Sequence, residues 1–145
     1  MGKSDWLEIS NQLRRIHPVM EKKLSTFEDT LGKAINAAKA CDPEGVCLAI
    51  DACKLSVALC SDIEHLMAMG IISEDSLKER IEEYVADRFH DIFLKFSACL
   101  SKDVEAQIMS RLIERASELE PRWLERLVSF AQEVREIERG SGRAV

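Results

Sequence analysis

The chain has 145 residues, of which 46% are apolar and 32% are charged, and this composition excludes a largely disordered protein. The net charge of −6, from 20 basic and 26 acidic residues, argues against the basic surface that nucleic-acid binding needs. Six glycines and three prolines are too few for the turn-rich pattern of an all-β protein. The length suits one domain, so we expect a single all-α domain over residues 1–145.

The first predicted helix covers residues 4–41. Its apolar residues recur at steps of three or four from Trp6 to Cys41, and the register passes straight through Pro18. We therefore expect one long helix that is kinked at Pro18, where a hydrogen bond is lost. The alternative is two helices that meet at this proline, with His17 as a cap.

The second and third helices are predicted over residues 43–69 and 73–100. Asp42-Pro43-Glu44 has the order of an N-cap, a first-turn proline and a first-turn acid. Gly70 is placed to end the second helix, and the sequence from Ser73 starts the third.

The fourth helix is predicted over residues 102–139, with a flexible tail at 140–145. Its apolar seam from Met109 to Ile137 again keeps its register through a proline, so we expect a kink at Pro121. Two helices meeting there, with Glu120 as a cap, are the alternative. Connections this short force antiparallel neighbours, so the sequence predicts an up-down-up-down four-helix bundle.

Three polar residues interrupt the predicted apolar faces. Glu64 falls on the inward side of its helix, Arg88 lies at the edge of the third apolar stripe, and His17 lies at the edge of the first. A buried charge is costly unless it is paired, so Glu64 and Arg88 should each have a partner. We favour structural pairs, and we keep Glu64, Arg88 and His17 as candidate ligands for a small anionic or polar molecule.

The five cysteines form no C-x-x-C motif. Antiparallel topology places Cys41, Cys47 and Cys99 at one end of the bundle, where thiolates could bind zinc or Cys41 and Cys47 could form a redox disulfide. A small core residue is the commoner role of a free cysteine. Cys53 and Cys60 are one heptad apart and are expected in the core.

The order of His65, His90-Asp91 and Asp103 resembles the order of metal ligands in HD-type phosphohydrolases, which are all-α. The helical pattern, however, places His65 and His90 away from the apolar stripes. Glu79, Glu82, Glu83, Asp87 and Asp91 form an acidic run that a solvated helix face explains.

We therefore expect a non-catalytic helical bundle that acts through protein contacts, either as a homo-oligomer or as a subunit of a complex. The alternatives are a metal- or ligand-dependent, phosphohydrolase-like enzyme with its site inside the bundle, and a thiol metal or redox site at one end. No cofactor is predicted, and zinc or another divalent metal belongs only to these alternatives. The N-terminal sequence lacks a secretion signal and the longest apolar stretch, 46–72, is charged, so we expect a cytoplasmic protein without a membrane partner.

Overall fold

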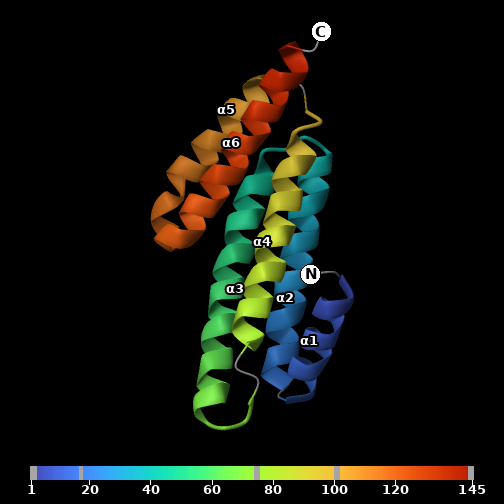
Figure 1. The fold of residues 1–145 in the computed structure, drawn as a ribbon, viewed down its shortest axis with the longest axis vertical. Coiled ribbons are helices and arrows are strands. Elements are labelled where there is room, and N and C mark those ends of the chain that lie inside the picture. The colour runs from blue at the N-terminus through green and yellow to red at the C-terminus, as the bar shows by residue number, and fades with distance from the viewer. Residues whose placement is uncertain (1–2, 17, 74–75, 100–101, 144–145) are drawn as a thin grey trace.

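The computed structural model describes residues 3–16, 18–73, 76–99 and 102–143, and every regular element in these ranges is helical (Figure 1). The elements are α1 (Lys3–Ile16), α2 (Pro18–Lys39), α3 (Glu44–Ala68), α4 (Leu77–Phe96), α5 (Lys102–Glu114), a short 3-10 helix η1 (Ala116–Glu118) and α6 (Pro121–Arg143). The all-α prediction is confirmed. The predicted count of four helices is wrong, because the described ranges contain six α-helices.

Helices α2, α3 and α4 run side by side in alternating directions and form the trunk of the molecule (Figure 1). Two ion pairs cross the end of the trunk at which α3 is followed by α4. Lys23 of α2 pairs with Asp62 of α3, and Lys78 of α4 pairs with Glu64 of α3. These three helices alternate in direction, but the predicted four-helix up-down-up-down bundle is not confirmed.

The predicted kink at Pro18 is wrong, because α1 turns back along α2. The indole of Trp6 stacks on the ring of Tyr84 at 4.5 Å, and its Nε1 donates to Glu28 at 3.3 Å. Trp6 and Glu28 are 22 residues apart, and one continuous helix would separate them by roughly 33 Å. Two helices meeting near Pro18 describe the structure, while the suggested cap, His17, lies outside the described residues.

The predicted kink at Pro121 is wrong for the same reason. Arg135 of α6 lies 2.9 Å from Glu105 of α5, a contact that only a reversed chain permits. Leu119 has extended backbone angles, and the main-chain carbonyl of Glu120 accepts the first hydrogen bonds of the helix that Pro121 begins. Helices α5 and α6 thus form an antiparallel hairpin, the α5–α6 hairpin.

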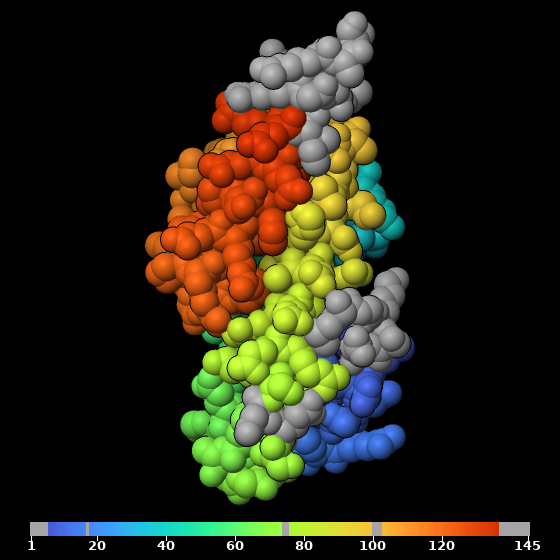
Figure 2. Space-filling model, in the orientation of Figure 1, coloured from blue at the N-terminus to red at the C-terminus, as the bar shows by residue number. Residues whose placement is uncertain are grey.

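The α5–α6 hairpin lies against only part of the trunk. Helix α5 packs on α3, and α6 packs on α4, where the ring of Phe130 lies 5.0 Å from His90 and 6.2 Å from Phe93. Figure 2 shows the hairpin over the upper part of this face, with the lower part of α4 beside it uncovered. The trunk and hairpin therefore meet along a seam that does not extend over the whole trunk.

The spacing of apolar residues does not predict either reversal, because the two helices of each pair bury their apolar stripes in the same core. Leu119 and Trp123 are four residues apart and both buried, so the spacing is the one a continuous helix would show. Proline removes a main-chain donor and restricts the residue before it, which permits either a kink or a reversal. Contacts far apart in sequence decide between the two.

Helix α3 begins at Glu44 and ends at Ala68, each within one residue of the predicted bounds 43–69. Asp42 accepts a hydrogen bond from the main-chain N–H of Glu44 at 3.0 Å, at the start of the helix. Gly70 has a φ of +75° directly after the C-cap Met69, the left-handed conformation that glycine adopts most easily. Helix α6 continues to Arg143, beyond residue 140, where the sequence analysis placed a tail.

The core is one apolar cluster shared by the trunk, α1 and the hairpin. Helix α3 approaches its neighbours closely at Gly45, where an added Cβ would meet Phe96 Cζ at 3.0 Å and the carbonyl oxygen of Ala34 at 3.2 Å. Only glycine allows α3 to come this close to α2 and α4. No helix among the described residues is sufficiently long and apolar to cross a membrane.

Candidate functional site

Glu64 does not point into the bundle, which corrects the sequence-based placement. Its side chain is 55% exposed and pairs with Lys78 across the trunk end. Their hydrogen bond is the main reason that the pKa of Glu64 is lowered and the pKa of Lys78 is raised. Both shifts favour the charged forms of the two side chains. A surface pair of this kind ties α3 to α4, and the Glu64 carboxylate is not directed into the bundle.

Arg88 is the more enclosed of the two predicted charges, with 21% of its side chain exposed. Its guanidinium pairs with Asp91 at 2.7 Å and lies 5.7 Å from the ring centre of Tyr84. Glu64 pairs elsewhere, so the structure does not join these two candidates in one site. The third candidate, His17, falls outside the described residues.

Cys53 and Cys60 lie in the core, as predicted. Burial is the main cause that raises the pKa of the Cys53 thiol to about 12 and that of Cys60 to about 11. Neutral thiols at this depth are poor nucleophiles and poor metal ligands. Ser56, between them, is also buried and donates its hydroxyl to the Cys53 carbonyl at 2.7 Å.

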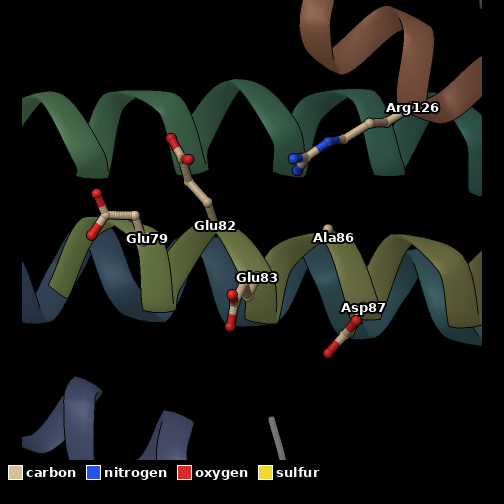
Figure 3. A pocket seen from close by; sticks show the side chains of 6 residues that line it. All are labelled: Glu79, Glu82, Glu83, Ala86, Asp87 and Arg126. Carbon is tan, nitrogen blue, oxygen red and sulfur yellow. The ribbon is translucent and has the colours of Figure 1, made fainter. Parts of the chain in front are cut away.

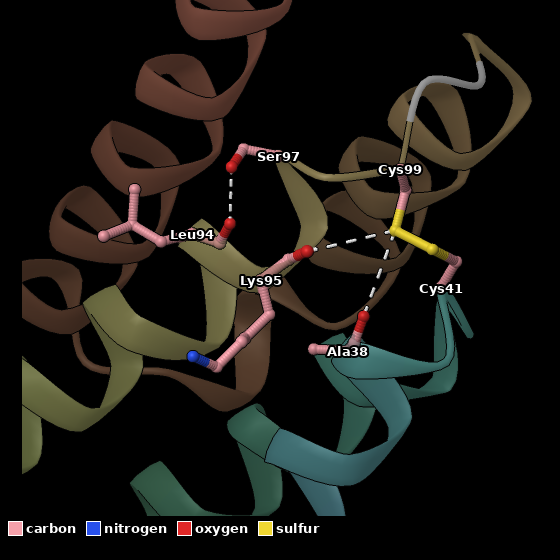
Figure 4. The surroundings of a disulfide bond; sticks show 6 residues. All are labelled: Ala38, Cys41, Leu94, Lys95, Ser97 and Cys99. Atoms are coloured by element: carbon pink, nitrogen blue, oxygen red, sulfur yellow. Dashed lines mark hydrogen bonds between the residues drawn. A yellow bond between two sulfur atoms is a disulfide. The ribbon is translucent and has the colours of Figure 1, made fainter.

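Of the three candidate cysteines at the other end of the trunk, two are bonded to each other and one is a free thiol. Cys41 and Cys99 form a disulfide with their Cα atoms 5.8 Å apart (Figure 4). Cys47 is free and half-buried, and its sulfur lies 3.8 Å from Nη1 of Arg111 on α5. The sequence placed these cysteines at one end but considered a disulfide only between Cys41 and Cys47, so the partner of Cys41 was missed.

The disulfide bears on the predicted compartment. Disulfides are rare in cytosolic proteins, and those that occur there are usually transient, catalytic or redox-sensing. A cytoplasmic location stays a prediction, and it agrees better with Cys41–Cys99 if this bond opens and closes. A permanently closed bond would favour an oxidising compartment instead.

The seam between trunk and hairpin carries a cluster of ion pairs that the sequence analysis did not assign. Arg115 lies at its centre: it donates to Asp51 at 2.7 Å, to Glu118 at 2.7 Å and to the Cys47 carbonyl at 3.1 Å. Lys54 donates to the same Glu118 at 2.9 Å. The side chains of Asp51 and Lys54 on α3 stay 46% and 49% exposed at this seam.

The acidic run on α4 borders an open groove of about 400 Å³ (Figure 3). Glu82 points toward the side from which Arg126 enters, whereas Glu83 and Asp87 point the other way. Glu82 also pairs with Arg122 at 2.7 Å. These carboxylates therefore do not converge on one point, as a divalent cation would require.

Beneath the Glu82–Arg122 pair lies a narrow void between α3, α4 and α6. Trp123 and Ser56 line it, and the indole N–H of Trp123 is buried without a hydrogen-bond partner among the described residues. The void has no room for a water molecule, so it is a packing defect and not a ligand cavity.

The histidines and the acid whose order resembled a phosphohydrolase set lie in different surroundings. His65 is exposed near the end of α3, and Asp103 is exposed in the first turn of α5. His90 is instead half-buried at the seam, where Nε2 lies 2.9 Å from the Glu133 carboxylate. Among the described residues no group of three or more histidines, cysteines or acids is arranged to hold a metal ion.

An apolar surface that was not predicted from the sequence lies at the end of the trunk where α3 is followed by α4. Met69 is 70% exposed and Ile71 is 51% exposed, on the two sides of Gly70. Val19, at the start of α2, is 51% exposed, and the Lys23–Asp62 pair shows that it belongs to the same end. A run of apolar residues interrupted by a glycine, MAMGII, was the available signal.

Comparisons with protein families, with curated proteins and with solved structures found no match to this chain.

Proposed function

We propose that this protein is a helical interaction module that associates with a second copy of itself through the apolar end of the trunk. Met69 and Ile71 support the proposal, because large apolar side chains in water favour burial by a partner. The longer seams predicted from the sequence are already used within the chain, by α1 and by the α5–α6 hairpin. The exposed end gathers three of the large apolar side chains that are exposed among the described residues, namely Val19, Met69 and Ile71.

The turn that carries Met69 and Ile71 is well fixed. The main-chain N–H of Met69 donates to the main-chain carbonyl of His65 at 3.1 Å, and that of Ile71 donates to the main-chain carbonyl of Leu66 at 2.9 Å. The exposed side chains therefore stand on an ordered turn, and a partner would not have to order the backbone on binding.

Sedimentation velocity over a range of concentrations tests this proposal. We expect the wild-type chain to form a dimer at high micromolar concentration, and we expect Met69→Ser/Ile71→Ser to weaken the dimer at least roughly tenfold. Ile113→Ser is the matched control, because Ile113 is also 70% exposed but lies on the hairpin. A sharp monomer mass for the wild type at high micromolar concentration would contradict self-association.

A further inference from the structure

The Cys41–Cys99 disulfide joins two connections that lie far apart in the sequence. Cys41 follows the C-terminus of α2, and Cys99 follows α4, shortly before α5 begins at Lys102. The bond therefore ties the α2–α3 turn to the point from which the α5–α6 hairpin leaves the trunk (Figure 4).

Cys41 has a backbone conformation that favours glycine. Its φ is +58°, which is disfavoured for a residue with a Cβ atom. The turn around it closes α2 with two hydrogen bonds, from Cys41 N to the Ala38 carbonyl at 3.1 Å and from Asp42 N to the Ala37 carbonyl at 2.8 Å. The disulfide thus holds a cysteine where the helix end alone would select glycine, and Cys41 is also the more accessible of the two cysteines.

The surroundings of the Cys99 sulfur can accept a hydrogen bond from a free thiol. This sulfur lies 4.0 Å from the Ala38 carbonyl oxygen and 3.9 Å from that of Lys95 (Figure 4). A disulfide sulfur carries no hydrogen, so these contacts are not hydrogen bonds while the bond is closed. A free thiol at Cys99 would have two acceptors within reach, so reduction would not strand a buried polar group.

The hairpin is also held to the trunk by packing. Buried side chains of both of its helices, such as Leu112 and Trp123, belong to the core shared with the trunk, and ion pairs at least partly open to solvent border this seam. Exposed ion pairs contribute little stability individually. The covalent bond adds a constraint at the point from which the hairpin leaves the trunk.

We propose that Cys41–Cys99 is a reversible redox latch that holds the α5–α6 hairpin against the trunk, and that a dithiol reductant opens it. One thiolate of the reductant attacks the accessible Cys41 sulfur, the sulfur–sulfur bond breaks, and Cys99 leaves as a thiolate that takes up a proton. The second thiol of the reductant then displaces Cys41, which leaves as a thiol. The reductant ends as its own disulfide, and the protein gains two electrons and two protons.

The other cysteines do not compete in this exchange. Cys53 and Cys60 are buried among apolar side chains, and Cys47 faces Arg111 in the seam between α3 and α5. Cys47→Ser is consequently a matched control, since it removes a thiol near the hairpin without touching the latch.

The test compares hydrogen exchange of the folded, oxidised wild-type chain with that of the same chain treated with dithiothreitol. Mass spectrometry after alkylation counts the thiols that have been released. We expect two additional thiols, and we expect amides of α5 and α6 to exchange at least roughly tenfold faster while those of α2 and α3 are unchanged. Oxidised glutathione should restore the slow exchange.

Cys41→Gly supplies a second measurement, because glycine keeps the left-handed turn while the bond is absent. It should show the fast hairpin exchange without reductant, and Cys47→Ser should respond to dithiothreitol as the wild type does. The proposal is overturned if the bond stays closed until the chain is denatured. It is equally overturned if the bond opens while the hairpin exchanges no faster than α2 and α3. Neither result depends on whether the chain forms a dimer.

Discussion

Arg115, directly after α5, donates a hydrogen bond of 2.7 Å to Asp51 of α3, a residue 64 positions earlier in the chain. The same guanidinium holds the Cys47 carbonyl and Glu118, so one side chain joins the hairpin, the 3-10 helix and the trunk. With 23% of its side chain exposed, it lies where water only partly screens these contacts.

Arg115→Met should lower the free energy of unfolding by about 1–2 kcal/mol, because three acceptors lose a charged donor at a partly enclosed seam. Urea denaturation followed by circular dichroism measures the change. Arg135→Met is the control: Arg135 pairs with Glu105 but is 52% exposed, so we expect a loss below about 0.5 kcal/mol. Equal losses in the two variants would contradict the central role of Arg115.

Glu118 should make stability depend on pH. Hydrogen bonds from Arg115 first, and from Lys54 second, lower its pKa from 4.5 to about 2. A carboxyl whose pKa is lowered by folding contributes stability above its unfolded pKa, and this contribution is lost as the pH falls toward the folded value. Wild type should therefore be more stable than Glu118→Gln at pH 7, and the difference should shrink as the pH falls from 4.5 toward 2. Urea midpoints of both proteins across this range test the prediction, and a constant difference would refute it.

Trp6→Ala should destabilise the chain by about 3–5 kcal/mol, since it removes a buried indole that stacks on Tyr84 and contacts Phe27. The experiment also tests the reversal at Pro18, because Trp6 in a continuous kinked helix would lie far from both rings. Leu7→Ala changes the next residue of α1, which is 58% exposed, and should cost less than about 0.5 kcal/mol. Similar small effects of both substitutions would argue that α1 is not docked as described.

Two glycine substitutions should have opposite signs. Gly45→Ala should cost about 1–3 kcal/mol, because its Cβ would press on Phe96 and on the main chain of α2. Gly32→Ala, inside α2, meets no atom within 4 Å and should stabilise the chain by up to about 1 kcal/mol through helix propensity. Thermal unfolding monitored at one helical wavelength measures both. A stabilising Gly45→Ala would contradict the close approach of α3 to α2 and α4.

Local chemistry in the sequence was sufficient for much of the fold. The spacing of apolar residues predicted the all-α class but not the number of helices, Asp42 and Gly70 marked the limits of α3, and Cys53 and Cys60 were correctly assigned to the core. These features depend on interactions between residues a few positions apart, or on burial itself, which a helical period reports directly.

The candidate sites were harder to predict for a related reason. Glu64 lay inside the apolar arc by angle, but a residue near a helix end can reach solvent and pair with Lys78 from any angle. His90 was placed away from the apolar stripes because its angle on the helix lies away from the third stripe. The segment after residue 102 folds into a hairpin, and His90 lies at its seam with the trunk, where Glu133 of α6 is its partner.

The sequence by itself therefore determined that the chain is helical, many of its buried residues and, to within one residue, the limits of α3, because short-range periodicity and capping carry that information. Only the tertiary structure decided that the chain reverses near Pro18 and Pro121, that Cys41 meets Cys99, and that Met69 and Ile71 remain in water. Each of these depends on which surfaces meet after the chain has turned. A kinked helix and a hairpin bury the same residues at the same spacing, so contacts between distant residues are what distinguish them.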